Sequence, residues 1–224
     1  MDLSPLWISL KIAFTATVIT FFLGVMAAWL VTGLRRGKHV VDGIFSVPLV
    51  LPPTVVGFLL LMLFGQSTAF GRFMSQAGLN VIFTWQGAVI AAVVISFPVM
   101  YRGTRGAIEQ VDENIIYAAR TLGMKEFWIL RKVILPSAWP GIVAAVVLSF
   151  ARALGEFGAT IMIAGNLPGK TQTMSVAVYT AMQGGNRELA MKWVLIIVAF
   201  SLTILILMNY LTGAGFRKRN GGGS

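Results

Sequence analysis

Five long stretches of the chain contain no charged side chain, and they carry the main structural signal. A helix of about 20 apolar residues crosses about 30 Å of hydrocarbon, so each stretch is long enough to span a membrane. The pattern predicts an all-α, polytopic membrane protein, with one transmembrane domain over residues 1–220. Its five transmembrane helices are expected near residues 8–34, 46–66, 80–104, 133–165 and 191–214.

Composition supports a membrane protein and removes several other classes. Apolar residues make up 57% of the chain and charged residues only 12%, against roughly a quarter charged in soluble domains. The absence of cysteine excludes a disulfide framework, a zinc knuckle and a thiol nucleophile. The first stretch is too long for a removable signal peptide and lacks a small-residue cleavage site, so we expect a first span there.

The lysines and arginines give the orientation, because their excess stays on the cytoplasmic side. Twelve of the 18 follow the first span, lie between the third and fourth, or close the chain, while five lie on the other side and Arg152 lies within a span. This distribution predicts an external N-terminus and an internal C-terminus. No basic stripe alternates with aromatic residues, so we expect no nucleic-acid partner. The terminal segment 221–224 is interpreted as an appended linker.

Three prolines interrupt the second predicted span. Pro48, Pro52 and Pro53 each lack a backbone donor and disfavour helix in the preceding residue. A broken backbone at membrane depth is tolerated only where protein or a water-filled cavity satisfies its polar groups, which predicts that this segment faces the interior of the bundle. The alternative is a kinked structural helix that starts at Pro53.

The segment 106–136, between the third and fourth spans, has the composition of helices rather than of a loop. Asp112 is placed to cap a helix, and Gly123 is placed to end it in a left-handed conformation. A second helix is expected from about Lys125 to Leu135, stopping at Pro136. The sequence therefore predicts a helix-turn-helix that projects into the cytoplasm. An amphipathic connector lying on the membrane is the alternative.

This segment resembles the signature loop of ABC importer permeases, which reads Glu-Ala-Ala, three residues, Gly, nine residues, Ile-x-Leu-Pro. Ala118-Ala119, Gly123 and the run 133–136 match its spacing, while Tyr117 replaces the glutamate and Val133 the isoleucine. The resemblance implies a type I ABC importer permease fold, in which this loop docks on a cytoplasmic ATPase. It also implies a coupling surface made of Tyr117, Ala118, Ala119, Arg120, Thr121, Leu122 and Gly123.

Two further blocks narrow the resemblance. The proline-rich run 47–57 and the run 150–160, followed by 165–171, are similar to the membrane subunits of molybdate importers. The resemblance implies a permease in a bacterial or archaeal cytoplasmic membrane that carries molybdate by alternating access. Importers of tungstate or of sulfate and thiosulfate are the alternatives. A stand-alone secondary anion transporter would usually show an internal repeat, which is missing.

A dianion such as molybdate cannot enter hydrocarbon and needs a wet cavity. Five helices are too few to enclose one, which predicts a path between two copies of the chain. The expected partners are a second copy, a cytoplasmic ABC ATPase dimer, an external molybdate-binding protein and the lipid bilayer. The lining should offer numerous weak donors. The candidates for the path or its gate are Pro52, Thr54, Ser149, Arg152, Glu156 and Thr160.

Arg152 and Glu156 are spaced to pair on one helix face, either as part of a gate or as a structural ion pair that orients the fourth span. The sequence predicts no catalytic residue, metal site or cofactor. His39 has no carboxylate or cysteine companions. The glycine loop 165–171 is one residue short of a phosphate-binding loop and is expected outside the cell. ATP hydrolysis is therefore expected on a separate chain.

Overall fold

The computed structural model describes residues 2–34 and 36–220, and all regular secondary structure within them is helical. Met1, Arg35 and the predicted linker 221–224 lie outside the described residues, as do the side chains of 207–209 and 211–220. The elements are α1 (Ser4–Thr32), α2 (Lys38–Val50), α3 (Pro53–Phe64), α4 (Ala69–Gln76), α5 (Trp85–Glu109), α6 (Glu113–Thr121), α7 (Glu126–Ile129), the π-helical turn η1 (Leu130–Ile134), α8 (Leu135–Leu154), α9 (Gly158–Ala164), α10 (Met174–Gln183) and α11 (Arg187–Asn220).

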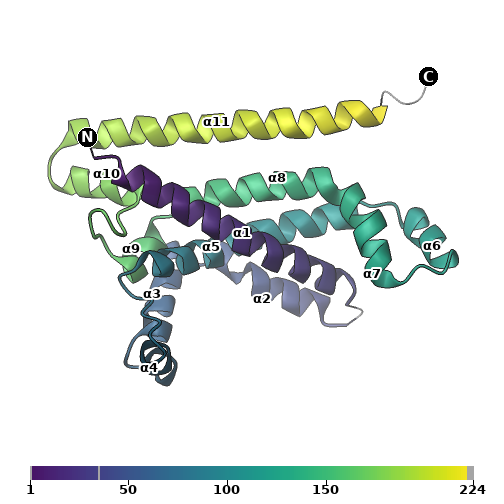
Figure 1. The fold of residues 1–224 in the computed structure, drawn as a ribbon, viewed down its shortest axis with the longest axis horizontal. Helices are drawn as coiled ribbons and strands as arrows, with labels where there is room; N and C mark the ends of the chain where they lie inside the picture. Colours follow the sequence, from purple (N-terminus) through teal and green to yellow (C-terminus); the bar gives the residue numbers. More distant parts are fainter. Residues whose placement is uncertain (1, 35, 221–224) are drawn as a thin grey trace.

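Four helical segments are long and apolar enough to cross a membrane: α1, α5, the rod from Glu126 to Leu154, and α11 from Arg187 to Ile206. The bent pair α2 and α3 makes a fifth if it is counted as one span. Figure 1 shows these segments running along the long axis, except α3, which turns away at one end. The chain is therefore an all-helical polytopic membrane protein, as the apolar pattern predicts.

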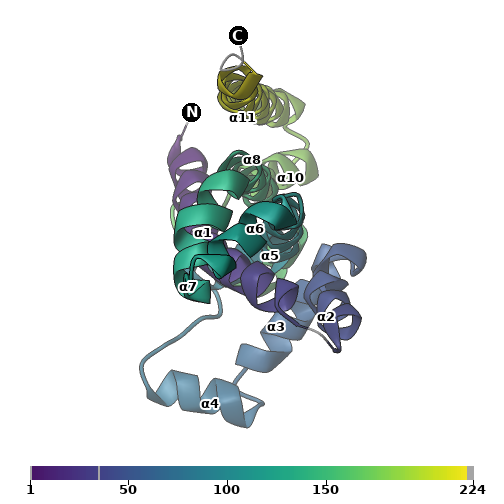
Figure 2. The same cartoon turned by 90° about the vertical axis from the view of Figure 1, so that its right-hand side faces the viewer.

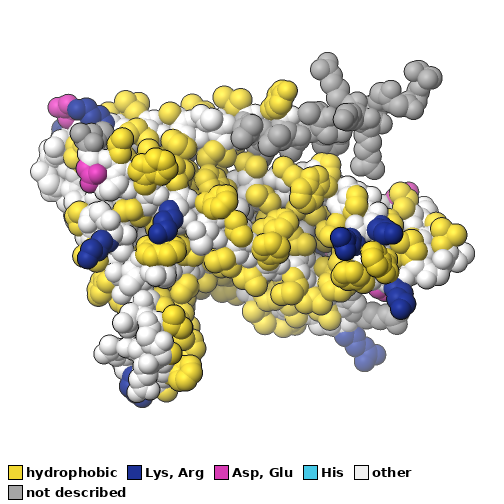
Figure 3. Space-filling view, in the orientation of Figure 1, with side chains coloured by type: hydrophobic (Ala, Val, Ile, Leu, Met, Phe, Trp, Pro, Cys, Tyr) yellow, Lys and Arg dark blue, Asp and Glu magenta, His cyan; other side chains and the backbone are white. Residues whose placement is uncertain are grey.

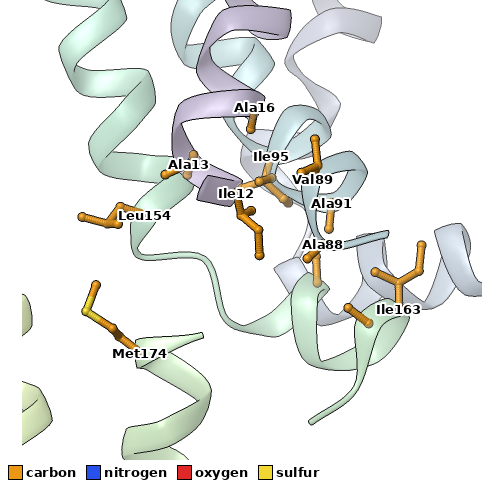
Figure 4. Close-up of a cluster of buried hydrophobic side chains, with 14 of the residues drawn as sticks. Ile12, Ala13, Ala16, Ala88, Val89, Ala91, Ile95, Leu154, Ile163 and Met174 are labelled. Atoms are coloured by element: carbon orange, nitrogen blue, oxygen red, sulfur yellow. The ribbon is translucent and has the colours of Figure 1, made fainter. Parts of the chain in front are cut away.

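Small side chains bring the central helices together. α1, α5, α8 and α9 bury a cluster rich in alanine, including Ala13, Ala88 and Ala91, together with Ile12 and Ile95 (Figure 4). Small residues allow close approach of helix backbones, which is the main source of attraction between helices in lipid. These helices form the packed body of the molecule.

Buried hydroxyl groups add directional contacts between the same helices. The Thr20 and Ser96 hydroxyls lie 3.3 Å apart and join α1 to α5. The Ser149 hydroxyl on α8 donates to the carbonyl of Ser96 at 3.4 Å. Interhelical hydrogen bonds of this kind fix helix register where the surroundings are apolar throughout.

The second predicted span, 46–66, is not one helix. α2 continues through Pro48, the chain is extended at Leu51 and Pro52, and α3 starts at Pro53 at 106° to α2. Proline is favoured at the first position of a helix because the missing N–H has no partner there. The helix is broken at the prolines, as the sequence predicts. The helix start at Pro53, which belonged to the alternative interpretation, is also present.

The fourth predicted span, 133–165, is wrong at both ends. Its helix begins at Glu126, runs through η1 into α8 without interruption, and ends at Leu154, while α9 is a separate short helix. Pro136 does not stop the second cytoplasmic helix, which contradicts the sequence prediction. The π turn resets the hydrogen-bond register, with the Leu135 N–H donating to the Leu130 carbonyl, so Pro136 falls in the first turn of α8.

The two ends of the molecule differ. The N-terminus, α9 and α10 lie at one end, and α6 and α7 lie at the other (Figure 1). Figure 2 shows α3 and α4 as an arm that stands away from the body. With the N-terminus outside, as the charges indicate, α6 and α7 lie on the cytoplasmic side.

Candidate functional site

The helix-turn-helix α6–α7 is closed by local hydrogen bonds. The Asp112 carboxylate accepts the N–H of Asn114 at 2.9 Å and caps α6. Gly123 has φ +75° and donates to the Arg120 carbonyl, while the Met124 N–H donates to the Ala119 carbonyl. These two bonds form a Schellman motif, which satisfies the last carbonyls of the helix. Both ends of α6 therefore lie where the sequence predicts.

An ion pair ties the two helices of this segment together. Arg120 on α6 contacts Glu126 at the start of α7 at 2.8 Å, and its guanidinium lies over the Tyr117 ring at 5.8 Å. The hydrogen bond to Glu126 raises the pKa of the Arg120 guanidinium, which stabilises a cation that arginine carries at physiological pH in any case. Arg120 thus stiffens the turn as well as facing outward.

The exposed surface of the segment combines apolar and small side chains. Leu122 at the tip is 81% exposed, and Tyr117 and Phe127 are also exposed. Ala118 is exposed, whereas Ala119 is only 5% exposed. Ala119 therefore does not form part of the exposed surface, in contrast to the expectation for the whole run 117–123. The burial pattern follows from helix periodicity, since adjacent residues point about 100° apart.

Two backbone breaks meet at the opposite end of the bundle. One is at Leu51–Pro52, between α2 and α3, and the other runs from Gly155 to Phe157, between α8 and α9. A Cβ on Gly158 would lie 3.1 Å from the Thr54 nitrogen, and one on Gly57 would lie 2.7 Å from the Ala159 Cα. α3 and α9 therefore pack backbone to backbone, and only glycine fits at these contacts.

Glu156 is the buried charge at this junction, with 3% of its surface exposed. One carboxylate oxygen accepts from Arg152 at 2.7 Å, and the other accepts the N–H of Ala159 at 2.8 Å. The ion pair is the one that the spacing predicts, whereas the bond to the start of α9 is not visible in the sequence. Glu156 thus connects the end of α8 to the start of α9 across the break.

The other candidate path residues divide into two groups. Pro52 and Thr54 are exposed beside the break, and Arg152 is partly exposed. Ser149 and Thr160 are fully buried within the chain, at 0% and 1% exposure. Neither hydroxyl reaches the surface of the chain in this arrangement, so a place for these two residues on the path or its gate stays a prediction. Ser149 instead joins α8 to α5.

Sequence reasoning missed an ionic network at the inner ends of α2 and α5. Arg105 pairs with both Asp42 and Glu109, and Glu109 also accepts from Lys38 at 2.9 Å. The Tyr101 hydroxyl donates to Asp42 at 3.0 Å. The signal that could have revealed this network is the position of Asp42 and Glu109, two carboxylates near the expected cytoplasmic ends of adjacent spans. The network attaches the start of α2 to the central helix α5.

Residues 20–218 match the family model described as "Binding-protein-dependent transport system inner membrane component". The chain belongs to this family. It is therefore a multi-pass inner-membrane subunit of a transport system. The family description names the binding protein apart from this membrane component. The fold described above is that of an ABC importer permease, a subunit separate from the ATPase.

The alignments with curated relatives cover most of the permease. It is 40% identical over 208 residues to the putative molybdenum transport system permease protein YvgM of Bacillus subtilis, covering 92% of each chain. It is 41% identical to the molybdenum transport system permease protein ModB of Escherichia coli K12, covering 91% of this chain and 90% of the relative. The sulfate transport system permease protein CysT of Salmonella typhimurium is 35% identical, over 91% and 74%.

Solved structures share the fold at lower identity. The permease aligns with a chain of the MetNI methionine ABC transporter in an inward-facing conformation, with a TM-score of 0.74, 20% identity and 94% of each chain covered. A chain of a bacterial alginate ABC transporter aligns with a TM-score of 0.77 and 15% identity, covering 95% of this chain and 79% of that one. These similarities support the ABC importer permease fold.

Proposed function

We propose that the chain is the membrane-spanning subunit of an ATP-driven importer that carries molybdate into the cell by alternating access. The capped, exposed helix-turn-helix at the end opposite the N-terminus is the observation that carries the proposal, because it offers an ATPase a preformed docking knuckle. Relatives named for molybdenum transport, about 40% identical over nine-tenths of the chain, favour molybdate. The sulfate relative makes sulfate the second candidate.

A second copy of the chain completes the translocation path. None of the residues of α2 is buried, and large apolar side chains are exposed on α2 and α3 (Figure 3). The break at Leu51–Pro52 exposes non-helical backbone, which lipid does not tolerate. Protein or water must cover it, and a two-fold related copy that encloses an aqueous path supplies both. Pro52 and Thr54 then lie at the path.

Movement reaches this path through a continuous rod. The Arg120–Glu126 pair links α6 to α7, and α7, η1 and α8 run without a break from Glu126 to Leu154, a length of about 43 Å at 1.5 Å per residue. ATP-driven closure of a partner ATPase pair draws two coupling helices together and tilts the two rods. The far end of each rod is Leu154, next to the break at Gly155–Phe157, which the Arg152–Glu156 pair borders. Closure turns the cavity outward at this end, and ATP hydrolysis returns it inward.

An external binding protein supplies selectivity by delivering the anion, since the permease path must release what it carries. Buried Glu156 bears charge of the same sign as the cargo, so its pairing with Arg152 keeps the gate region electrically neutral while the dianion passes. The gate role of Arg152 and Glu156 is part of this proposal.

Transport in reconstituted vesicles tests the proposed function. The permease is combined with its ATPase and binding protein, and uptake of molybdate, tungstate and sulfate is measured in turn with and without ATP. We expect ATP-dependent accumulation of molybdate that exceeds that of sulfate. Faster sulfate uptake would move the assignment to the second candidate. Uptake driven by an ion gradient without ATP would overturn the importer mechanism.

A further inference from the structure

A pocket of about 500 Å³ lies at the end of the molecule that carries the N-terminus, far from the coupling helices. It is bounded by α1, by the start of α5 with the residues before it, and by the loop that precedes α10. Lys11, Lys170, Thr84, Gln86 and Thr171 supply its polar groups, and no carboxylate is among the described residues that line it. We call this the outer pocket.

The outer pocket holds two cations without counter-ions. Lys11 lies over the Trp85 ring, with its Nζ 3.9 Å from the ring centroid, and Lys170 lies in the loop before α10. Within the described part of the chain, neither lysine pairs with a carboxylate. The aromatic face holds the Lys11 ammonium in place without neutralising its charge. The pocket therefore has an uncompensated positive charge.

A buried hydroxyl adds a directional donor. Thr171 is 1% exposed, and its Oγ1 accepts the Leu167 N–H at 3.1 Å. Among the described residues this leaves the hydroxyl proton available to a ligand in the pocket. Two ammonium groups and a hydroxyl donor are the groups that bind an oxyanion.

The wall of the pocket is held in a strained conformation. Phe83 has φ +57°, which is rare for a bulky residue, and its N–H donates to the Ile163 carbonyl at 3.0 Å. Its ring lies over Gly165, where a Cβ would approach to 2.9 Å. Such strain persists only where the surroundings fix it, and it is concentrated at functional sites. The pocket is thus preformed.

The level of the pocket in the membrane indicates the ligand. α1 is about 43 Å long and exceeds the hydrocarbon core by several residues at each end, so Lys11, about two turns into α1, lies near the headgroup boundary. Trp85 beside it belongs to the residue type that gathers at this boundary. Ile8, Ile12 and Phe83 add an apolar wall that a soluble anion would not use.

We propose that the outer pocket binds a phosphate-type oxyanion at the outer surface of the membrane. The phosphate of an anionic lipid headgroup uses both the cations and the apolar wall, whereas a free oxyanion uses the cations alone. The site is separate from the proposed translocation path. Its position at the outer surface depends only on the N-terminus lying outside the cell. A bound lipid here would join α1 to the α9–α10 loop and the start of α5 at their outer ends.

Native mass spectrometry of the purified full chain tests the proposal, with phosphatidylglycerol, phosphatidylcholine and inorganic phosphate as separate probes. The variants are Lys11→Gln, Lys170→Gln and the double substitution, and Lys192→Gln is the matched control because that lysine already pairs with Glu188. We expect retention of phosphatidylglycerol to fall about fivefold in each single variant and roughly thirtyfold in the double variant. The Lys192→Gln control should bind like the unmodified chain.

The probes separate the two sources of the oxyanion. Lysine-dependent retention of phosphatidylglycerol that excess inorganic phosphate does not displace supports a lipid site. Lysine-dependent binding of inorganic phosphate, without preference for phosphatidylglycerol, supports the oxyanion site with a soluble source. Equal binding of every probe by the double variant and the Lys192→Gln control overturns the proposal. Because Lys170 is exposed in a loop, its single variant provides this comparison even if the double variant does not fold.

Discussion

Glu156 shows how one residue can serve a break in a transmembrane helix. A carboxylate buried in hydrocarbon is stable only when it is paired and hydrogen-bonded. Here Arg152 neutralises it from one turn earlier, and the first turn of α9 supplies an N–H. The residue therefore satisfies part of the backbone that the break exposes.

Replacing the carboxylate by an amide separates the two roles of Glu156. In Glu156→Gln the side-chain oxygen can still accept the Ala159 N–H, while the ion pair is lost. We expect normal assembly with the ATPase and a reduction of at least about tenfold in uptake, since Arg152 is left without its partner. Glu188→Gln is the control, because it removes an exposed pair of the same spacing. Unchanged uptake in Glu156→Gln would exclude a gating role.

Gly57 tests the close contact between α3 and α9. A methyl group at this position would lie 2.7 Å from the Ala159 Cα, so the two helices must separate in Gly57→Ala. We expect destabilisation by about 1–3 kcal/mol, measured as a lower midpoint of thermal unfolding in detergent. Gly106→Ala on α5 is the control, because its added methyl group would meet no atom of another helix within 4 Å. Equal midpoints for the two variants would contradict the packing described here.

The sequence specified some residues of the candidate site and not others. The Arg152–Glu156 pair and the caps at Asp112 and Gly123 follow from spacing alone, because both partners lie within one or two turns. The burial of Ser149 and Thr160 could not be predicted because the spans are apolar on all sides, so the sequence does not indicate which face of each helix packs against the protein. Their burial depends on contacts with α5 and the rest of the bundle.

At the level of elements, the rod from α7 through α8 is the main departure from the sequence prediction. A proline after a helical pattern is read as a stop, yet Pro136 continues the helix because η1 precedes it. A π turn leaves no mark in hydrophobic periodicity, since it inserts only one residue into the register. As a result, α7 and the fourth span form one continuous helix from Glu126 to Leu154.

The Arg120–Glu126 pair joins α6 to the start of this rod. In the proposed mechanism it passes the motion of α6 to the rod. Reversing one charge in Arg120→Glu places two carboxylates together and should reduce ATP-driven uptake several-fold. Because both side chains of this pair are exposed to solvent, overall stability should change little. Adding Glu126→Arg restores the attraction and should recover most of the uptake. Failure of the double variant to recover would indicate that Arg120 acts on another partner rather than within the turn.

At the scale of the whole molecule, the fold and its orientation follow from simple patterns. Charge-free stretches locate the spans, and the distribution of lysines and arginines places the N-terminus and the α6–α7 end on opposite sides. The 106° bend between α2 and α3 could not be predicted beyond the fact of a break, because prolines remove hydrogen bonds without setting an angle. The exposed faces of α2 and α3 likewise require the three-dimensional structure.

Side-specific labelling of the α6–α7 tip tests the central claim most directly. The chain has no cysteine, so a single Leu122→Cys substitution at the 81% exposed tip gives an unambiguous label site. In sealed vesicles of known orientation, the account predicts labelling by an impermeant maleimide only from the cytoplasmic side, and protection when the ATPase is bound. Labelling from the outer side, or equal labelling with and without the ATPase, would contradict the coupling of this segment to a cytoplasmic ATPase.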